Sequence, residues 1–296
     1  MIQLFKRGIQ STLKAFFSAF EAEKNEFEKR ILLRHDTFWN HPDAEMIRNM
    51  PMGADEPIQK WKNVAHWQRK LSNKYNAREF ARMHGCRVPA LYWRGRNVKE
   101  IDFEKLPEQY VIRPTIGHSS ERVYLMNKSV NLMDKHIYTP DALRKNLSKA
   151  IARNKYLEFL IEEFVRDEKG VHRIPDDYKI AAFNGEIAVI DVINRTSPKT
   201  GFSSCYDEHW NRVPNLAGFY QPAPLQEPPA CLQDMLACAR KLSKAYEIFV
   251  RIDFYATDKG AVFGEFTPTP SRGKGFTPDA NKLLVDYWDK FCTGMI

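Results

Sequence analysis

The chain has few cysteines, and those that it has form no motif. Only five of its 296 residues are cysteine, an odd number, and none form a Cys-x-x-Cys pair. Structural zinc sites need such closely spaced pairs, and disulfide frameworks need an even count. We therefore expect reduced thiols in a cytoplasmic protein, without structural zinc or a disulfide framework.

Long apolar runs are also missing. No run approaches the roughly 20 residues that span a bilayer. Lys6 and Arg7 are not followed by the uninterrupted apolar stretch of a signal peptide. Hydrophobic residues make up 43% and charged residues 28% of the chain, which is typical of a globular protein. A chain of this length can bury a large core in one or two domains.

Several common functional motifs are absent as well. The sequence has no G-x-S-x-G elbow, no Walker A loop and no H-E-x-x-H pair. It also lacks helix-turn-helix, RNP and zinc-finger signatures. The net charge of +8 favours anionic partners. We do not expect nucleic acid to be that partner, which leaves nucleotide phosphates, an acidic polymer or an acidic membrane.

The N-terminal region is expected to be helical. Apolar residues recur at spacings of three and four from Ile9 to Leu32, which predicts one or two amphipathic helices. Their apolar side can pack on the body of the protein or on a second subunit. Alternatively, this segment, with its lysines and phenylalanines, can attach to an anionic membrane. Residues 36–60 are expected to form an irregular connector.

The strongest pattern lies near the C-terminus, where residues 250–255 and 263–267 alternate apolar and polar side chains. This alternation predicts two strands, and the residues between them favour a tight turn. If the turn centres on Lys259, opposed positions lie on one face of the hairpin. The pairs are then Asp253 with Glu265, and Arg251 with Thr267.

Two opposed carboxylates repel each other unless a cation lies between them. Oxygen ligands beside an arginine suit Mg²⁺ that carries nucleotide phosphates. The alternative is an ordinary solvated hairpin with a local Arg–Asp pair, and the spacing alone favours neither.

Three further segments could contact a nucleotide. Residues 110–126 read as a strand, a Gly/Ser loop and a strand, which can form a phosphate flap or an ordinary hairpin. Residues 157–165 are apolar with internal glutamates, which need either adenine and ribose groups or nearby basic residues as partners. Asn184-Gly185 predicts a hairpin over residues 177–195, in which Lys179 suggests an anion contact. Residues 196–230 read as loops, and residues 140–155 and 231–247 as helices.

The order of these features resembles the TupA-like branch of the ATP-grasp superfamily, from about residue 70 to the end. The resemblance is carried by residues 73–79 (N-K-Y-N-A-R-E), 106–114 (L-P-E-Q-Y-V-I-R-P), 177–179 (D-Y-K), 183–185 (F-N-G), 250–255 (V-R-I-D-F-Y) and 263–267 (F-G-E-F-T). It implies an α+β ATP-grasp fold, in which two α+β subdomains grip ATP and Mg²⁺. The implied organisation is a helical extension (1–60), a small pre-grasp-like region (61–107), a small subdomain with the phosphate flap (108–165) and a large subdomain with the metal site (166–296).

The resemblance also implies a role for individual residues. For the nucleotide, the resemblance implies that Arg113 contacts the α- and β-phosphates, that Gly117, Ser119 and Ser120 form the flap, and that Glu162, Glu163 and Val165 form the adenine hinge, with Asp167 or Glu168 near the ribose. For the reacting phosphate, it implies that Lys179 and Arg251 hold the γ-phosphate and that Asp253, Glu265 and Thr267 bind Mg²⁺. For the substrate, it implies that the loop from Arg272 to Gly275 orients the carboxylate or stabilises its oxyanion. The chain departs from the family pattern at Arg113, where lysine is usual, and at Thr267, where asparagine is usual. The second departure puts a second metal ion in doubt.

The implied activity is that of an ATP- and Mg²⁺-dependent carboxylate–amine ligase that works through an acyl phosphate. The expected substrates are an amine and an acid, such as an amino acid, a peptide or a uronic-acid glycan, in cell-surface polymer or secondary-metabolite biosynthesis. A kinase on the same scaffold and a non-catalytic binder of nucleotide or anionic polymer are the alternatives.

Overall fold

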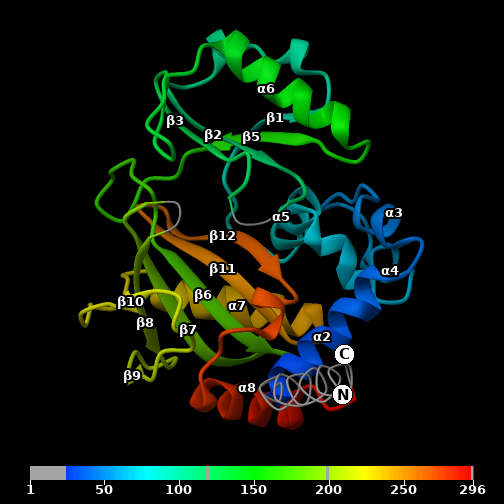
Figure 1. Ribbon diagram of the computed structural model, residues 1–296, viewed down its shortest axis with the longest axis vertical. Coiled ribbons are helices and arrows are strands. Elements are labelled where there is room, and N and C mark those ends of the chain that lie inside the picture. The colour runs from blue at the N-terminus through cyan, green and yellow to red at the C-terminus, as the bar shows by residue number, and fades with distance from the viewer. Residues whose placement is uncertain (1–24, 118–119, 198–199, 295) are drawn as a thin grey trace, which may run out of the picture.

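Two β-sheets with helices packed on them organise residues 25–117, 120–197, 200–294 and 296, which are the residues that the computed structural model describes. The smaller sheet lies at the top of Figure 1 and the larger sheet below it. All strand pairs are antiparallel except that of β8 with β10. This arrangement is the α+β class that the sequence predicts.

The smaller sheet has the strand order β1-β5-β2-β3-β4. Its strands are β1 (Leu91–Gly95), β2 (Gln109–Pro114), β3 (Tyr124–Asn127), β4 (Val130–Asn131) and β5 (Phe159–Glu163). Helix α6 (Pro140–Arg153) packs against this sheet through Leu143 and Leu147. The helix begins where Thr139 accepts a hydrogen bond from the backbone N–H of Ala142, a standard N-cap.

The larger sheet has the order β10-β8-β7-β6-β11-β12, with β9 paired to β8. Its strands are β6 (Asp177–Phe183), β7 (Glu186–Arg195), β8 (Gly201–Tyr206), β9 (Arg212–Val213), β10 (Gln221–Pro222), β11 (Val250–Thr257) and β12 (Gly260–Thr267). The predicted Asn-Gly turn joins β6 to β7, and Asn184 and Gly185 have φ values of 49° and 101°. Both values lie in the region that such a turn requires.

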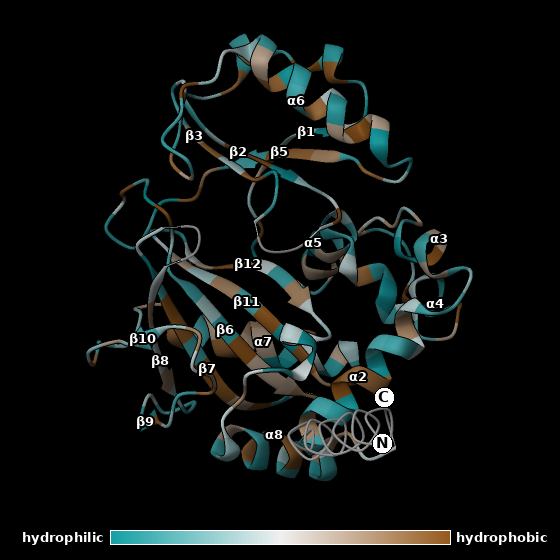
Figure 2. Cartoon of the chain, viewed as in Figure 1, coloured by the Kyte–Doolittle hydropathy of each residue, from teal (hydrophilic) through white to brown (hydrophobic). Residues whose placement is uncertain are grey.

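The two faces of the larger sheet have different coverings. One face packs on α7 (Leu232–Tyr246) through residues such as Ile180 and Phe254. On the other face, α8 (Pro278–Phe291) and α2 (Glu26–Trp39) cover only one end. Figure 2 shows hydrophobic residues along β6, in keeping with its burial between these layers. The other end of the second face stays open to the smaller sheet.

The N-terminal part of the described chain is helical, as predicted. Phe27 and Ile31 of α2 are fully buried against α8 and the sheet, so this half of the amphipathic pattern packs on the body of the protein. The earlier half of the pattern, up to residue 24, lies outside the described residues, and with it the predicted membrane or dimer contact.

Some local expectations were wrong. The segment 36–60 contains two short helices, α3 (Ala44–Arg48) and α4 (Ile58–Trp61). The next elements along the chain are η1 (Trp67–Ser72) and α5 (Lys74–Met83), and the side chain of Asn73 caps the start of α5. Residues 196–230 are rich in loops, as expected, but they also contain the strands β8, β9 and β10. The shorter 3₁₀ turns are η2 (Val98–Glu100), η3 (Phe103–Lys105) and η4 (Pro270–Gly273).

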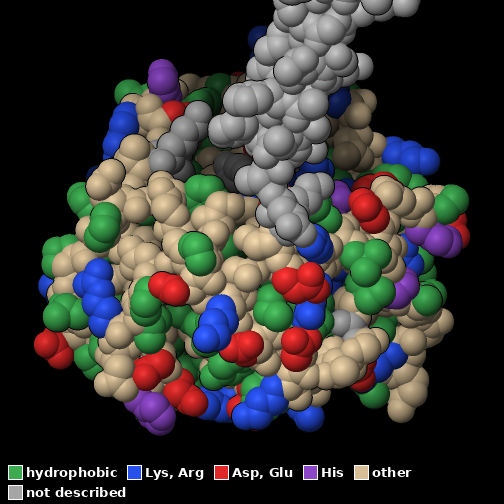
Figure 3. All heavy atoms as spheres, turned by 60° about the horizontal axis from the view of Figure 1, so that its bottom comes forward, with side chains coloured by type: hydrophobic (Ala, Val, Ile, Leu, Met, Phe, Trp, Pro, Cys, Tyr) green, Lys and Arg blue, Asp and Glu red, His purple; other side chains and the backbone are tan. Residues whose placement is uncertain are grey.

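The visible surface of the described residues carries charges of both signs (Figure 3). No helix among them is both long and apolar enough to cross a bilayer. On the face turned forward in Figure 3, basic and acidic side chains are interspersed where the described residues are visible.

Candidate nucleotide and metal site

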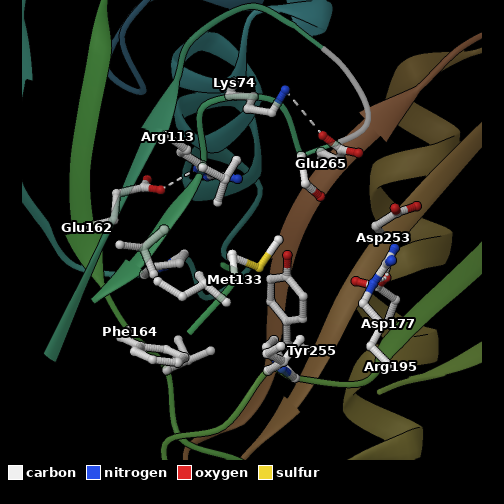
Figure 4. Close-up of a pocket in the computed structure, with 18 of the residues that line it drawn as sticks. Lys74, Arg113, Met133, Glu162, Phe164, Asp177, Arg195, Asp253, Tyr255 and Glu265 are labelled. Atoms are coloured by element: carbon white, nitrogen blue, oxygen red, sulfur yellow. Dashed lines mark hydrogen bonds and ion pairs between the residues drawn. The ribbon is translucent and has the colours of Figure 1, made fainter. Parts of the chain in front are cut away.

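A pocket opens between the two sheets, and its lining comes from both of them. The smaller sheet contributes residues of β2 and β5, and the larger sheet contributes residues of β6, β7, β11 and β12. The start of α5 and the loop that follows β2 complete the wall. Figure 4 shows side chains from these elements pointing into the shared space.

The C-terminal hairpin has the register that the sequence predicts. Asp253 lies opposite Glu265, and Arg251 lies opposite Thr267. The turn itself differs, because Thr257 pairs with Gly260 and the reversal therefore centres between Asp258 and Lys259.

A β-bulge at Gly264 compensates for this shift of the turn, so that Asp253 still pairs with Glu265 as predicted. The register shifts between the pair Asp253–Glu265 and the pair Phe254–Phe263, so Gly264 is an extra residue in β12. Because side chains alternate along a strand, removing this residue would turn Glu265 toward the core face. A Cβ on Gly264 would lie 3.0 Å from the carbonyl oxygen of Asp253, which explains why the bulge has a glycine.

Asp253 is buried and held by two cations. Its carboxylate accepts hydrogen bonds from Lys179 Nζ at 2.5 Å and from Arg251 Nε and Nη2 at 2.7 and 2.9 Å. Burial alone would raise the pKa of Asp253, but the charges of Arg251 and Lys179 outweigh it and lower that pKa. Asp253 is therefore ionised, as a metal ligand must be.

Glu265 is half-buried and lies near Lys74 of α5. Lys74 Nζ is 3.4 Å from Glu265 Oε2 and donates to the carbonyl oxygen of Gly117 at 3.1 Å. Figure 4 shows Lys74 reaching across the pocket toward this carboxylate. Lys74 thus connects α5, the loop after β2 and the proposed metal strand. Sequence reasoning assigned it no role, although it lies in the first segment that carries the family resemblance.

Arg113 of β2 belongs to a buried charge network. Its guanidinium donates to Glu162 of β5 and, at 3.2 Å, to the carbonyl oxygen of Gly264. Glu162 also lies 3.3 Å from Arg78 Nε, and Arg78 Nη1 donates to Glu79 at 2.9 Å. Burial would lower the pKa of Arg113, but the charge of Glu162 raises it. The network joins the two sheets through the contact of Arg113 with Gly264, ties the smaller sheet to α5 and fixes Arg113 at the wall of the pocket.

The glutamates of the predicted hinge have basic partners. Glu163 accepts from Lys259 and from the backbone N–H of Ala90, the latter at 3.1 Å. Together with the Arg113–Glu162 pair, this matches the alternative in which the acidic strand pairs with nearby basic residues. Glu162, Glu163 and Val165 nonetheless all line the pocket.

The structure gathers most of the remaining predicted residues in or beside this pocket. Gly117 and Ser120 line it with Lys179, Asp253 and Glu265, whereas Ser119 lies outside the described residues. Arg251 and Thr267 adjoin it, and Arg251 Nη2 donates to Thr267 Oγ1 at 2.9 Å.

Three predicted residues lie elsewhere. Asp167 and Glu168 line a separate small hollow, where Asp167 accepts from Arg173 at 2.6 Å. Arg272 is exposed in η4 and does not line the pocket.

Asp177, Arg195 and Tyr255 line the pocket but were missed. Arg195 Nε donates to Asp177 at 2.7 Å, and Asp177 lies 3.5 Å from Lys179 Nζ. Figure 4 shows the Tyr255 ring between Met133 and the charged cluster. Since Asp177 and Tyr255 each lie two residues from a predicted site residue on the same strand, strand alternation could have found them.

The donor set suits a triphosphate that carries Mg²⁺. Asp253 and Glu265 form an opposed pair of carboxylates. Mg²⁺ is commonly bound by one or two carboxylates together with substrate phosphates and water. Lys74, Lys179 and Arg113 supply positive charge to those phosphates.

Comparison with known proteins identifies the family of the chain. The model of the family described as TupA-like ATPgrasp matches residues 58–288. No curated protein sequence matches the chain. Among solved structures, a D-alanine–D-alanine ligase from Bacillus anthracis has 17% sequence identity and a TM-score of 0.50, with 75% of this chain and 67% of that chain covered.

Two related structures were also found. The B. anthracis ligase in complex with ATP has 16% identity and a TM-score of 0.48, with 75% of this chain and 65% of that chain covered. The VanG D-Ala:D-Ser ligase from Enterococcus faecalis has 16% identity and a TM-score of 0.49, with 76% and 62% covered. The chain thus spans less than two thirds of the length of these two ligases. The fold is that of the ATP-grasp ligases, and this chain belongs to the TupA-like ATP-grasp family.

Proposed function

We propose that the chain is an ATP- and Mg²⁺-dependent ligase that joins a carboxylic acid to an amine. The observation that carries the proposal is the opposed pair Asp253–Glu265, which faces a pocket with cations on several sides. A triphosphate needs both features, because the metal binds oxygen ligands and phosphoryl transfer depends on positioning and charge neutralisation.

Residues from the two sheets would bind different parts of the metal–nucleotide complex. Bound Mg²⁺ would supply the positive charge that stabilises phosphoryl transfer. Asp253 and Glu265 would hold it from the large sheet, while Arg113 would bind phosphate oxygens from the small sheet. When ATP binds, Lys179 and Arg251 would leave Asp253 and contact the γ-phosphate instead.

Two chemical steps follow from this placement. The acid's carboxylate oxygen attacks the γ-phosphorus, which forms an acyl phosphate and releases ADP. The amine then attacks the carbonyl carbon, inorganic phosphate leaves, and the nitrogen loses a proton to form the amide. The positive charge of the chain favours an acidic substrate such as an amino acid, a peptide or a uronic-acid glycan.

The proposal can be tested by ADP release from a panel of acid and amine pairs, with mass detection of the product. Wild-type protein should release ADP only with a matched pair and should form an amide. Glu265→Gln should lose this turnover, while Glu56→Gln, at an equally half-buried glutamate that does not line the pocket, should keep it. Near-normal ADP release by Glu265→Gln would contradict the metal assignment.

Hydroxylamine separates a ligase from a kinase on the same scaffold. It intercepts an acyl phosphate and gives a hydroxamate, whereas a kinase yields a stable phosphorylated product and no hydroxamate. ATP binding without turnover across the whole panel would instead indicate a non-catalytic nucleotide binder.

A further inference from the structure

A short connector, residues 84–90, joins α5 to β1 and contacts both sheets. The carbonyl oxygen of Arg87 accepts from the backbone N–H of Phe263 at 2.9 Å, on the edge strand β12 of the larger sheet. Further along, the carbonyl oxygen of Ala90 accepts from the backbone N–H of Glu163 in β5 at 2.8 Å. The connector is therefore hydrogen-bonded to the larger sheet at one point and to the smaller sheet at another.

The first half of the connector also runs along α7. A Cβ on Gly85 would lie 3.9 Å from Lys241 Nζ. Arg87 Nη1 donates to Asp234 Oδ2 at 2.5 Å. Asp234 and Lys241 lie about two turns apart on one face of the helix, so the connector crosses this face in the direction opposite to the chain of α7.

Each side of this interface has a cysteine at its centre. Cys86 is the connector residue between the two contacts, and Cys238 occupies the turn of α7 between them. Both are free thiols in the same buried cluster, with 5% and 8% of their surface exposed. The flanking contacts thus place the two side chains opposite each other.

The two thiols differ in acidity because they interact. A hydrogen bond with Cys86 lowers the pKa of Cys238 and outweighs the effect of burial. The positive charges of Lys241 and Arg87 also lower this pKa, whereas the charge of Asp234 raises it. The same hydrogen bond, together with burial, raises the pKa of Cys86. Since the thiolate is the form that reacts with oxidants, Cys238 is the more reactive of the two.

We propose that Cys86 and Cys238 form a redox modification site, which hydrogen peroxide converts into a disulfide. The sulfur of Cys238 attacks a peroxide oxygen, the O–O bond breaks, and a sulfenic acid and water are formed. The sulfur of Cys86 then attacks the sulfenic sulfur, and the S–S bond forms as hydroxide leaves and takes up the proton of Cys86. In total, the thiols lose two electrons and two protons, and peroxide is reduced to two molecules of water.

The disulfide would join the connector covalently to α7. Because Cys86 and Cys238 lie far apart in the sequence, the bond closes a long loop and restricts the unfolded chain. It also fixes the connector at the place where both sheets are hydrogen-bonded to it. Neither cysteine lines the pocket, so the inference does not rest on the proposed ligase function.

Mass spectrometry of the full chain tests the disulfide. Reduced protein is treated with hydrogen peroxide, the remaining thiols are blocked with N-ethylmaleimide, and tryptic peptides are analysed without reduction. We expect a linked pair of peptides that contain Cys86 and Cys238, and we expect dithiothreitol to separate them. Absence of this pair, or pairing of Cys238 with a different cysteine, would overturn the proposal.

Single variants test the order of the two steps. Cys86→Ser should leave Cys238 as a sulfenic acid that dimedone traps, whereas Cys238→Ser should leave Cys86 unlabelled at the same peroxide dose. The matched control is Cys292→Ser, which removes a buried cysteine from another cluster and should form the disulfide as wild type does. Equal dimedone labelling of Cys86→Ser and Cys238→Ser would contradict the assignment of Cys238 as the attacking thiol.

Thermal unfolding measures what the bond does to the fold. Oxidised wild-type protein should melt about 5 °C or more above the reduced protein, because the disulfide closes a long loop. Cys292→Ser should show the same rise, and Cys86→Ser should show none. An unchanged or lower melting temperature in wild-type protein that contains the linked peptides would overturn the stabilising role of the bond.

Discussion

Replacement of Asp253 by asparagine should separate the structural role of this carboxylate from its catalytic role. The side chain is 4% exposed and receives three charge-assisted hydrogen bonds from Lys179 and Arg251. Asparagine keeps the shape but loses the charge, so the largely buried Lys179 and Arg251 lose their nearest counter-ion. Breaking a buried ion pair in this way costs about 3–5 kcal/mol. We expect the free energy of unfolding of Asp253→Asn to fall by roughly 3 kcal/mol.

Urea unfolding followed by circular dichroism measures this loss, and its pH dependence identifies the cause. The pKa of Asp253 is lowered in the folded state, so its contribution is present above the unfolded pKa of about 3.9. It is lost as the pH falls through the lower, folded pKa. The gap between wild type and variant should therefore persist from pH 7 to pH 5 and narrow only at more acidic pH. A gap below about 1 kcal/mol at pH 7 would refute the buried, charge-paired carboxylate.

Three further outcomes follow from the same contacts. Gly264→Ala should destabilise the protein by about 1–3 kcal/mol in urea and weaken Mg²⁺-dependent nucleotide binding, because the bulge that aims Glu265 is lost. Lys74→Met should weaken binding of an ATP analogue about tenfold in calorimetry, whereas Lys60→Met on the exposed side of α4 should not. Mg²⁺ without nucleotide should leave the melting temperature unchanged, because Lys179, Arg251 and Lys74 already neutralise both carboxylates. A rise with Mg²⁺ alone would contradict that pairing.

The main elements of the fold could be predicted from the sequence because their signals are local. Alternation revealed β11 and β12, and Asn184-Gly185 fixed the hairpin of β6 and β7. Strand β8 was missed because its residues, Gly201–Tyr206, show no clean alternation between apolar and polar side chains. Its place in the sheet depends on pairing with β7, which is a tertiary interaction.

The site could be predicted only in part, for a similar reason. The pairing of Asp253 with Glu265 was predicted correctly, but the bulge at Gly264 is what offsets the displaced turn and produces it. The contact of Lys74 with Glu265 joins α5 to β12, two elements that lie far apart in the sequence. No local sequence pattern indicates this contact. The bulge at Gly264 likewise depends on a close backbone approach that only the folded chain reveals.

Calorimetric titration of a non-hydrolysable ATP analogue, with and without Mg²⁺, tests the central claim most directly. Glu265→Gln removes one of the two proposed ligands at a half-buried position, so it should disturb the fold less than a change at Asp253. We predict that Mg²⁺ tightens binding of the analogue about tenfold or more in wild-type protein and leaves it nearly unchanged in Glu265→Gln. The same tightening in both proteins would contradict a magnesium ion held between Asp253 and Glu265.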